Sequence, residues 1–108
     1  MAEPRMTQTT QAVLRVLLAD PTADAYGLEI GAATGLPSGT IHPILARLES
    51  LGWVRSDWED IDPKVAGRPR RRYYRISDEG LAAARQALAR AHASRTTLAA
   101  RWAAGEPA

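Results

Sequence analysis

The sequence predicts a mainly α fold with a small antiparallel β-hairpin (α+β): three short helices, the hairpin and one long C-terminal helix. Apolar residues recur at helical spacing in three segments before residue 52 and again after residue 78. Between them, two short segments alternate apolar and polar residues around a polar connection with prolines and a glycine, which is typical of a hairpin. The 108 residues suffice for one compact domain and are too few for two ordinary ones.

The first two helices are expected at residues 7–19 and at about residues 24–34. Thr7 can cap the first helix, and Asp20-Pro21 ends it. The second helix ends in the tight turn of Gly35-Leu36-Pro37. Their apolar faces consist of Val13, Leu14, Leu17 and Leu18 in the first helix, and of Tyr26, Ile30 and Ala33 in the second.

The third helix is expected at residues 39–51, with Ser38 as its N-cap and Gly52 at its C-terminal stop. Its inward stripe consists of Ile41, Ile44, Leu45, Leu48 and Leu51. Pro43 is compatible with this helix, because only the hydrogen bond to the Gly39 carbonyl is lost and Gly39 has no side chain to clash with the ring.

Two strands, Trp53–Glu59 and Arg72–Ser77, form the predicted hairpin, and residues 60–71 form its polar tip. In the first strand one face carries Val54, Ser56 and Trp58, and in the second Tyr74 and Ile76 lie on the face opposite to Tyr73 and Arg75. We expect Trp53 and Trp58 in the core, because aromatic side chains of strands commonly pack against helices.

The long helix is expected from Asp78 to about Ala103, with Ser77 as its N-cap and a length of roughly 39 Å. A seam at spacings of three and four residues runs along it and consists of Leu81, Ala84, Leu88, Ala91, Arg95, Leu98 and Trp102. This seam predicts a dimer interface with the last or first helix of a partner. The alternative is a helix that folds back on its own domain.

Positive charge is concentrated in one short segment, although the formal net charge is only +2. Five arginines lie within eight residues: Arg68, Arg70, Arg71, Arg72 and Arg75. Arginine suits bidentate contacts with phosphate, so this segment predicts contact with nucleic acid. The preceding acidic group, Asp57, Glu59, Asp60 and Asp62, is interpreted as soluble surface, with pairing to the arginines as the alternative.

Composition excludes several classes of protein. The chain has no cysteine and only two histidines, His42 and His92, so no disulfide scaffold, thiolate zinc site or multi-histidine metal site is expected. No nucleophile–base pair, paired acids or phosphate-binding glycine loop indicates an enzyme, and no cofactor is expected. No apolar run is long enough to span a membrane and no secretory signal is present, so the expected compartment is the cytoplasm.

Three short helices, a hairpin and a further helix is the element order of a winged helix-turn-helix, here followed by a long C-terminal dimerisation helix. The turn at residues 35–37 joins the two helices of the motif, and the third helix is expected to enter the major groove. Residues 7–77 form the predicted DNA-binding domain and residues 78–103 the dimerisation helix, while residues 1–6 and 104–108 are expected to be flexible ends.

Several segments carry a family resemblance: Tyr26-Gly27 with Ile30, the run from Leu36 to Glu49, Leu51-Gly52-Trp53-Val54, Trp58-Glu59, the run from Gly67 to Ser77, and Gly80. By these segments the sequence resembles transcriptional regulators of the PadR family, in the short form with a single C-terminal helix. The resemblance covers about residues 10–82 and departs at His42, where the family usually has tyrosine. It implies repression of transcription, often with release by a small molecule or a stress signal.

The candidate DNA-binding residues lie on the third helix and the hairpin. They are Ser38, Gly39, Thr40, His42, Pro43, Arg47, Arg68, Arg70, Arg71, Arg72 and Tyr73. The small residues of the third helix permit close approach to the groove floor, and the polar and basic ones suit phosphates. The alternatives are a salt bridge for Arg47, a partly buried position for His42 and a solvated loop for the arginine cluster.

The sequence therefore predicts a sequence-specific transcriptional regulator, a repressor that binds a palindromic operator in double-stranded DNA as a homodimer. A small aromatic or apolar effector is expected near the dimer interface, with Trp53, Trp58 and Trp102 as candidate walls. The alternative function is a winged-helix protein-interaction module without DNA binding, and the five arginines of the hairpin argue against it.

Overall fold

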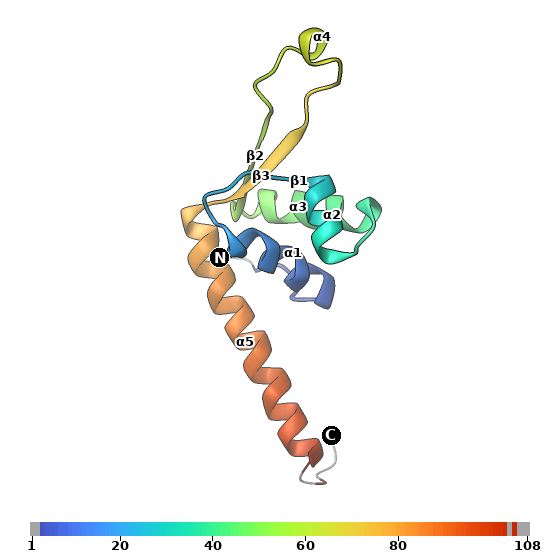
Figure 1. The fold of residues 1–108 in the computed structure, drawn as a ribbon. Helices are drawn as coiled ribbons and strands as arrows, with labels where there is room; N and C mark the ends of the chain where they lie inside the picture. Colours follow the sequence, from blue (N-terminus) through green and yellow to red (C-terminus); the bar gives the residue numbers. More distant parts are fainter. Residues whose placement is uncertain (1–2, 104, 106–108) are drawn as a thin grey trace.

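A computed structural model describes residues 3–103 and 105 of the chain (Figure 1). Its elements follow in the order α1 (Gln8–Ala19), β1 (Ala25–Tyr26), α2 (Gly27–Thr34), α3 (Ser38–Ser50), β2 (Val54–Trp58), α4 (Pro63–Ala66), β3 (Arg72–Ile76) and α5 (Asp78–Ala103). The predicted fold class, mainly helical with a small antiparallel sheet and a long C-terminal helix, is confirmed. Residues 1–2, 104 and 106–108, which belong to the predicted flexible ends, lie outside the described residues.

The first described residues lie against the domain. Pro4 is buried, and Nε2 of Gln11 donates a hydrogen bond to the Met6 carbonyl at 2.7 Å. Glu3 forms an ion pair with Arg90 of α5. Side chains of α1 and α5 therefore contact the described part of the segment for which a flexible end was predicted.

The described residues form a three-stranded antiparallel sheet in which β3 lies between β1 and β2. The sequence predicted only the β2–β3 hairpin and placed residues 24–34 in one helix, which was wrong at its start. Instead, β1 pairs with β3, with Ala25 opposite Tyr74. Helix α2 begins after Tyr26, whose N–H donates a hydrogen bond to the Glu29 carboxylate at 3.1 Å. Local periodicity did not reveal β1, because its partner strand is distant in sequence.

The core lies where α1, α2, α3, the base of the sheet and the first turns of α5 meet. Its largest fully buried side chains are Trp53, Leu14, Ile30, Ile41, Leu45, Leu48, Val13 and Val54. The predicted inward stripes of the first and third helices are therefore confirmed. In α2, Ile30 is buried as predicted, whereas Ala33 is exposed.

Helix α3 starts one residue before its predicted position. The carbonyl of Pro37 accepts hydrogen bonds from the N–H groups of Thr40 and Ile41 at 3.0 and 3.1 Å. Pro37 is therefore the N-cap, and the prediction of Ser38 as the cap was wrong, because the extended backbone of Pro37 already positions the first accepting carbonyl. Gly52 follows the helix with a φ of 77°, a left-handed conformation that glycine adopts without steric cost.

Strands β2 and β3 form a hairpin that projects beyond the helices (Figure 1). Its register pairs Val54 with Ile76 near the helices and Trp58 with Arg72 farther out. Trp53 is 2% exposed and lies in the core as predicted, but Trp58 is 53% exposed. The core prediction for Trp58 was wrong, because the strand leaves the helices before it reaches this residue. The polar tip contains the one-turn helix α4, which the sequence did not predict.

Helix α5 has 26 residues and begins where predicted. Oγ of Ser77 accepts a hydrogen bond from the Gly80 N–H at 2.9 Å, which confirms the predicted N-cap. Ala84 and Ala87 are buried in the core of this chain, next to α1. The assignment of Ala84 to a partner was therefore wrong, because the chain's own domain covers the first part of the predicted seam.

The second half of α5 extends away from the domain (Figure 1). Leu98 and Trp102 are 48% and 63% exposed on it. The structure has a radius of gyration of 16.7 Å, whereas a compact domain of about 100 residues has about 13 Å. Within residues 3–103 and 105, no helix combines the length and the apolar character that a membrane span requires.

Candidate nucleic-acid interface

Helix α3 presents a face of small side chains to solvent. Its exposed residues include Ser38, Gly39, His42, Pro43, Ala46 and Arg47, and Thr40 is half-buried. A Cβ atom built on Gly39 would meet no other atom within 4 Å. A helix with such a face can approach the floor of a major groove closely, but it offers few groups that hydrogen-bond to base edges.

The alternatives considered from the sequence were a partly buried position for His42 and a salt bridge for Arg47, and the structure shows neither among the residues it describes. His42 is exposed, and a Cβ atom built on Gly27 would lie 3.3 Å from its Cε1, so the imidazole lies over the start of α2. The partly buried position was therefore wrong. The Arg47 side chain is exposed and forms no ion pair or hydrogen bond within residues 3–103 and 105, so the salt-bridge alternative was wrong as well.

The β2–β3 hairpin with its tip, residues 54–76, is called the wing, and side chains tie its base to α3. The hydroxyl of Ser56 donates a hydrogen bond to the carboxylate of Glu49. Nη2 of Arg72 donates to Ser56 Oγ at 2.7 Å and lies 3.5 Å from Glu49 Oε1. The Arg72 guanidinium also lies over the Trp58 ring, 5.4 Å from its centroid. These contacts fix the direction of the wing relative to α3.

Glu59 holds the far part of the wing together. Its two carboxylate oxygens accept hydrogen bonds from Arg68 at 2.6 and 2.9 Å, and one of them accepts another from the Arg71 N–H at 3.3 Å. Nε of Arg70 donates to the Ile61 carbonyl at 2.9 Å. The interpretation of Glu59 as soluble surface was therefore wrong, and the alternative of pairing with an arginine is confirmed for this residue.

These hydrogen bonds shift the pKa values of both partners. The bonds from Arg68 lower the pKa of Glu59 from its ordinary 4.5 to about 2, although partial burial opposes the change. The hydrogen bonds with Glu59 raise the pKa of Arg68. Both groups therefore stay charged at neutral pH, and the pair acts as a clamp between the two sides of the wing.

A second cluster lies where β1 meets β3. The rings of Tyr26 and Tyr73 meet edge to face with centroids 6.4 Å apart, and the Arg71 guanidinium lies 5.9 Å from the Tyr26 centroid. Arg75 forms an ion pair with Asp24 at 2.7 Å. Burial raises the pKa of Tyr26, and nearby carboxylates raise it further. Tyr73, a candidate DNA-binding residue, is therefore half-buried and in contact with another ring.

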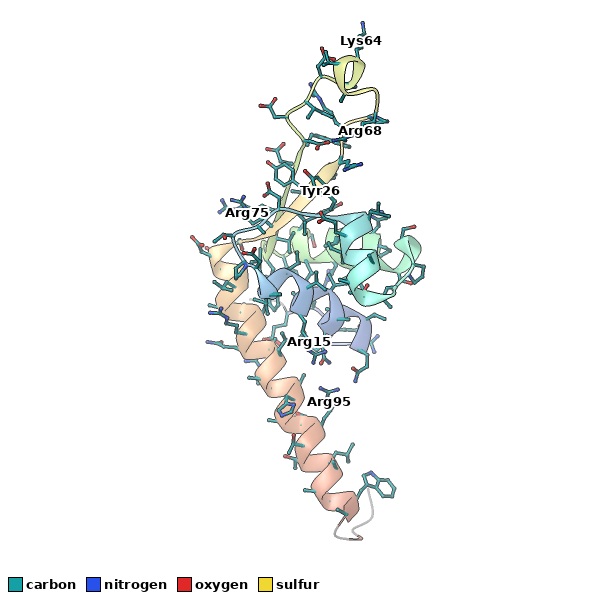
Figure 2. All side chains as sticks on the ribbon, in the orientation of Figure 1. Arg15, Tyr26, Lys64, Arg68, Arg75 and Arg95 are labelled. Carbon is teal, nitrogen blue, oxygen red and sulfur yellow. The ribbon has the colours of Figure 1, made fainter. Side chains whose placement is uncertain are left out.

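The wing arginines fall into two groups. Arg68, Arg72 and Arg75 form ion pairs with acids, whereas Arg55, Arg70 and Arg71 are exposed and have no carboxylate partner for their guanidinium groups in the described part of the chain. Figure 2 shows the basic side chains along the wing from its tip to its base. The structure thus leaves Arg55, Arg70 and Arg71 as the guanidinium groups of the wing that are open to an external anion, and of these Arg70 and Arg71 belong to the predicted arginine cluster.

The pKa of Glu59 predicts that the clamp opens only in strong acid. Because the pKa is about 2 in the folded chain and 4.5 when the group is free, the clamp stabilises the fold fully above about pH 4.5 and loses this effect as the pH falls toward 2. An NMR titration of the carboxyl carbon should give Glu59 a midpoint near 2. The substitution Arg68→Ala should return the midpoint toward 4.5, and a midpoint of 4.5 in the unchanged protein would contradict the clamp.

A family model for the transcriptional regulator PadR-like family matches residues 13–86. The chain belongs to this family. Among solved structures, the PadR family transcriptional regulator from Eggerthella lenta DSM 2243 is 27% identical to it with a TM-score of 0.67, and the match covers 85% of this chain and 80% of that chain. No curated protein sequence matches the chain.

Two further structures share the fold of this PadR-like regulator. A PadR-like transcription factor from Bacteroides fragilis is 19% identical with a TM-score of 0.68, over 84% of this chain and 86% of that chain. MepR, a transcription regulator of the Staphylococcus aureus multidrug efflux pump MepA, is 16% identical with a TM-score of 0.64, over 90% of this chain and 66% of that chain. The fold is thus one that transcriptional regulators of distant sequence use.

The three tryptophans considered as effector walls lie in different parts of this PadR-like regulator. Trp53 is in the core, and its buried Nε1 has no hydrogen-bond partner among the described residues. Trp58 lies on the wing and Trp102 near the end of α5, and both are exposed. One chain therefore does not bring them together, and only Trp58 and Trp102 are accessible to a ligand.

Sequence reasoning missed the roles of two residues that shape the interface, Tyr26 and Gly80, and gave the pairing of Glu59 only as an alternative. Gly80 packs against the backbone of Trp53, where a Cβ atom would lie 2.1 Å from the Trp53 carbonyl oxygen. The local signal for it is a glycine in the first turn of an alanine-rich helix, which indicates close packing. For Tyr26 no local signal exists, because its role depends on the strand and the arginine that the fold places beside it. For Glu59 the acidic group next to the arginine cluster was a signal, but it did not show which arginine pairs with it.

Proposed function

We propose that this PadR-like regulator binds double-stranded DNA with α3 in the major groove and the wing on the neighbouring backbone. The observation that carries the proposal is the exposed face of small residues on α3, next to a wing on which Arg70 and Arg71 have no carboxylate partner in the described part of the chain. Membership of a family of transcriptional regulators supports the same reading. The structure of α3 suits insertion into the groove because no large side chain blocks the approach of Gly39, Pro43 and Ala46 to the bases.

The proposed contacts divide between phosphates and bases. Arg70 and Arg71 bind backbone phosphates, while Arg68 and Arg72 are positioning residues that hold the wing through Glu59 and Glu49. On α3, the residues proposed to contact phosphates are Ser38, Thr40, His42 and Arg47. Sequence specificity then comes from thymine methyl contacts, DNA shape and the spacing of half-sites.

We propose that residues 7–77 form the DNA-binding domain and that residues 78–103 form the dimerisation helix. The support is the projecting second half of α5, with Leu98 and Trp102 exposed on it. Two copies related by a two-fold axis would bind a palindromic operator with half-sites about one helical turn apart.

We further propose that the bound dimer represses transcription and that a small aromatic or apolar molecule releases it. The structural neighbour BpsR of Bordetella bronchiseptica has its DNA binding regulated by 6-hydroxynicotinic acid. In the chain described here, the accessible aromatic side chain nearest to the proposed dimer interface is Trp102. Quenching of tryptophan fluorescence by a compound that also releases DNA, and its loss in Trp102→Leu, tests this site.

Selection of binding sites from random DNA tests the proposed function directly. The expected result is enrichment of palindromes whose half-sites lie about one helical turn apart. Absence of any enriched or bound duplex at low salt would overturn the proposal and favour a protein-interaction module. Enrichment of single half-sites would retain DNA binding but contradict the dimer.

The substitution Arg70→Ala is expected to weaken binding to operator and random DNA by the same factor, because a phosphate contact carries no base information. Each lost phosphate contact lowers the slope of log K against log salt concentration by about 0.9. Because a dimer loses two such contacts, its slope should fall by about 1.8. Fluorescence anisotropy at several salt concentrations measures both effects. Arg70→Lys, which keeps the charge, should retain most of the slope, and an unchanged slope in Arg70→Ala would exclude this contact.

A further inference from the structure

An open pocket of about 390 Å³ separates the N-terminal segment from α3. One wall includes Pro4, Arg5 and Thr7, and the other includes Pro43, Ile44 and Arg47. The pocket therefore borders the exposed face of α3 that the proposed function places in the major groove. Neither the DNA-binding residues expected from the sequence nor the wing contacts include the N-terminal wall.

The charge of this pocket is positive. Arg5 and Arg47 lie on opposite walls, both are exposed, and neither side chain has an ion pair or hydrogen bond within residues 3–103 and 105. Glu3 is the one carboxylate among the residues that line the pocket, and its partner is Arg90 of α5. Two exposed arginines without an ion pair in the described part of the chain thus line one concave surface, which suits an anion.

Arg5 is held at this place by its neighbours on both sides. Pro4 is buried, Glu3 is paired with Arg90, and the Met6 carbonyl accepts a hydrogen bond from Gln11. These contacts reduce the conformational freedom that the segment would lose on binding. The backbone that carries Arg5 is therefore already in place, and its exposed side chain can reach an anion at the pocket.

The pocket lies on the side of α3 that faces away from the wing. Successive residues of a helix are rotated by about 100°, so Arg47 and Glu49 point about 200° apart, to opposite flanks of the exposed face. Glu49 faces the wing, because it pairs with Ser56 and Arg72. A helix in a major groove about 12 Å wide has a row of phosphates on each side. The flank with Arg47 and Arg5 therefore faces the row of phosphates on the side of the groove that lies away from the wing.

We propose that Arg5 and Arg47 together bind a backbone phosphate of the DNA strand on the side of α3 opposite to the wing. The inference rests on the proposed DNA binding and adds Arg5 of the N-terminal segment as a contact. The duplex is then held on both sides of α3, by Arg70 and Arg71 on one side and by Arg5 and Arg47 on the other. Because these contacts reach phosphates, they position α3 in the groove without selecting bases.

Fluorescence anisotropy with a labelled random-sequence duplex tests the inference, using Arg5→Ala, Arg47→Ala and Arg5→Lys. The matched control is Arg85→Ala, which removes one exposed arginine from α5. Because the two arginines share one phosphate, Arg5→Ala and Arg47→Ala should each weaken binding, and the double variant should lower the slope of log K against log salt by about 1.8 in a dimer, or about 0.9 for each protomer bound. At low salt the affinity should fall roughly tenfold or more, whereas Arg5→Lys should retain most of it. Thermal unfolding should be unchanged, because both arginines are exposed.

The outcomes separate this inference from the proposed function. If Arg5→Ala binds as Arg85→Ala does while Arg70→Ala is weakened, the N-terminal contact is excluded and the DNA-binding function stands. If the unchanged protein does not bind the duplex at low salt, the proposed function itself fails. If each single variant binds more weakly than Arg85→Ala and the double variant lowers the slope by no more than about 1.8 in a dimer, the two arginines share one phosphate as proposed. A double variant that lowers the slope by about 3.6 would mean two separate phosphates for each protomer and would overturn the shared site.

Discussion

Gly80→Ala is expected to lower the free energy of unfolding by about 3 kcal/mol or more, because the new methyl group would overlap backbone atoms. A Cβ atom at this position would lie 2.1 Å from the Trp53 carbonyl oxygen and 2.6 Å from the Trp53 Cα. The backbone there cannot easily yield, since the same carbonyl accepts a hydrogen bond from the Ser77 N–H at 2.9 Å. Thermal unfolding should show a Tm that is lower by more than about 10 °C.

Gly39→Ala is the matched control for this prediction. Gly39 is also helical, but a Cβ atom there would meet nothing within 4 Å. The expectation that the Pro43 ring needs the missing side chain at Gly39 was therefore wrong. Because alanine favours the helix over glycine by up to about 1 kcal/mol, this variant should unfold at the same or a slightly higher temperature. If both alanine variants unfolded at the same temperature, the close packing of α5 on Trp53 would not explain why residue 80 is a glycine.

Replacing Leu98 and Trp102 with aspartate is expected to turn the proposed dimer into a monomer. Burial of a large apolar side chain contributes about 1.5 kcal/mol or more, and a two-fold interface contains both residues twice. Loss of these four contributions raises the dissociation constant of the dimer by on the order of 10⁴. Both side chains are exposed in the single chain, so the variant should fold normally. Sedimentation velocity measures the oligomeric state, and binding to a palindrome should fall to the level of one half-site.

Val65→Asp provides a control for the dimer prediction. Val65 is 86% exposed on α4 at the wing tip, far from α5 in the fold. If exposed apolar side chains in general caused association, this variant would also dissociate. We expect it to stay dimeric, and a double variant at Leu98 and Trp102 that stays dimeric would place the interface elsewhere.

Local patterns were sufficient to predict most elements of this protein. Helical spacing of apolar residues placed α1, α3 and α5 within about one residue of their ends, and the alternation around the polar tip placed the two long strands. The cap at Ser77 was also predictable, because its partner is the N–H of Gly80 in the following turn. The order of these elements then predicted the fold class and the exposed face of α3.

Partners that are distant in sequence were decided by the packing of the elements. Arg72 reaches Glu49 only because the wing packs against α3. The ion pair of Arg90 with Glu3 likewise joins residues that are 87 positions apart in the sequence. The same holds for β1, whose pairing with β3 overrode the helical pattern around Tyr26. Periodicity shows which face of an element is apolar, but it does not show which element will cover that face. The tertiary structure alone therefore decided that α1 covers the start of α5, that Leu98 and Trp102 stay exposed, and that Arg5 and Arg47 share one pocket.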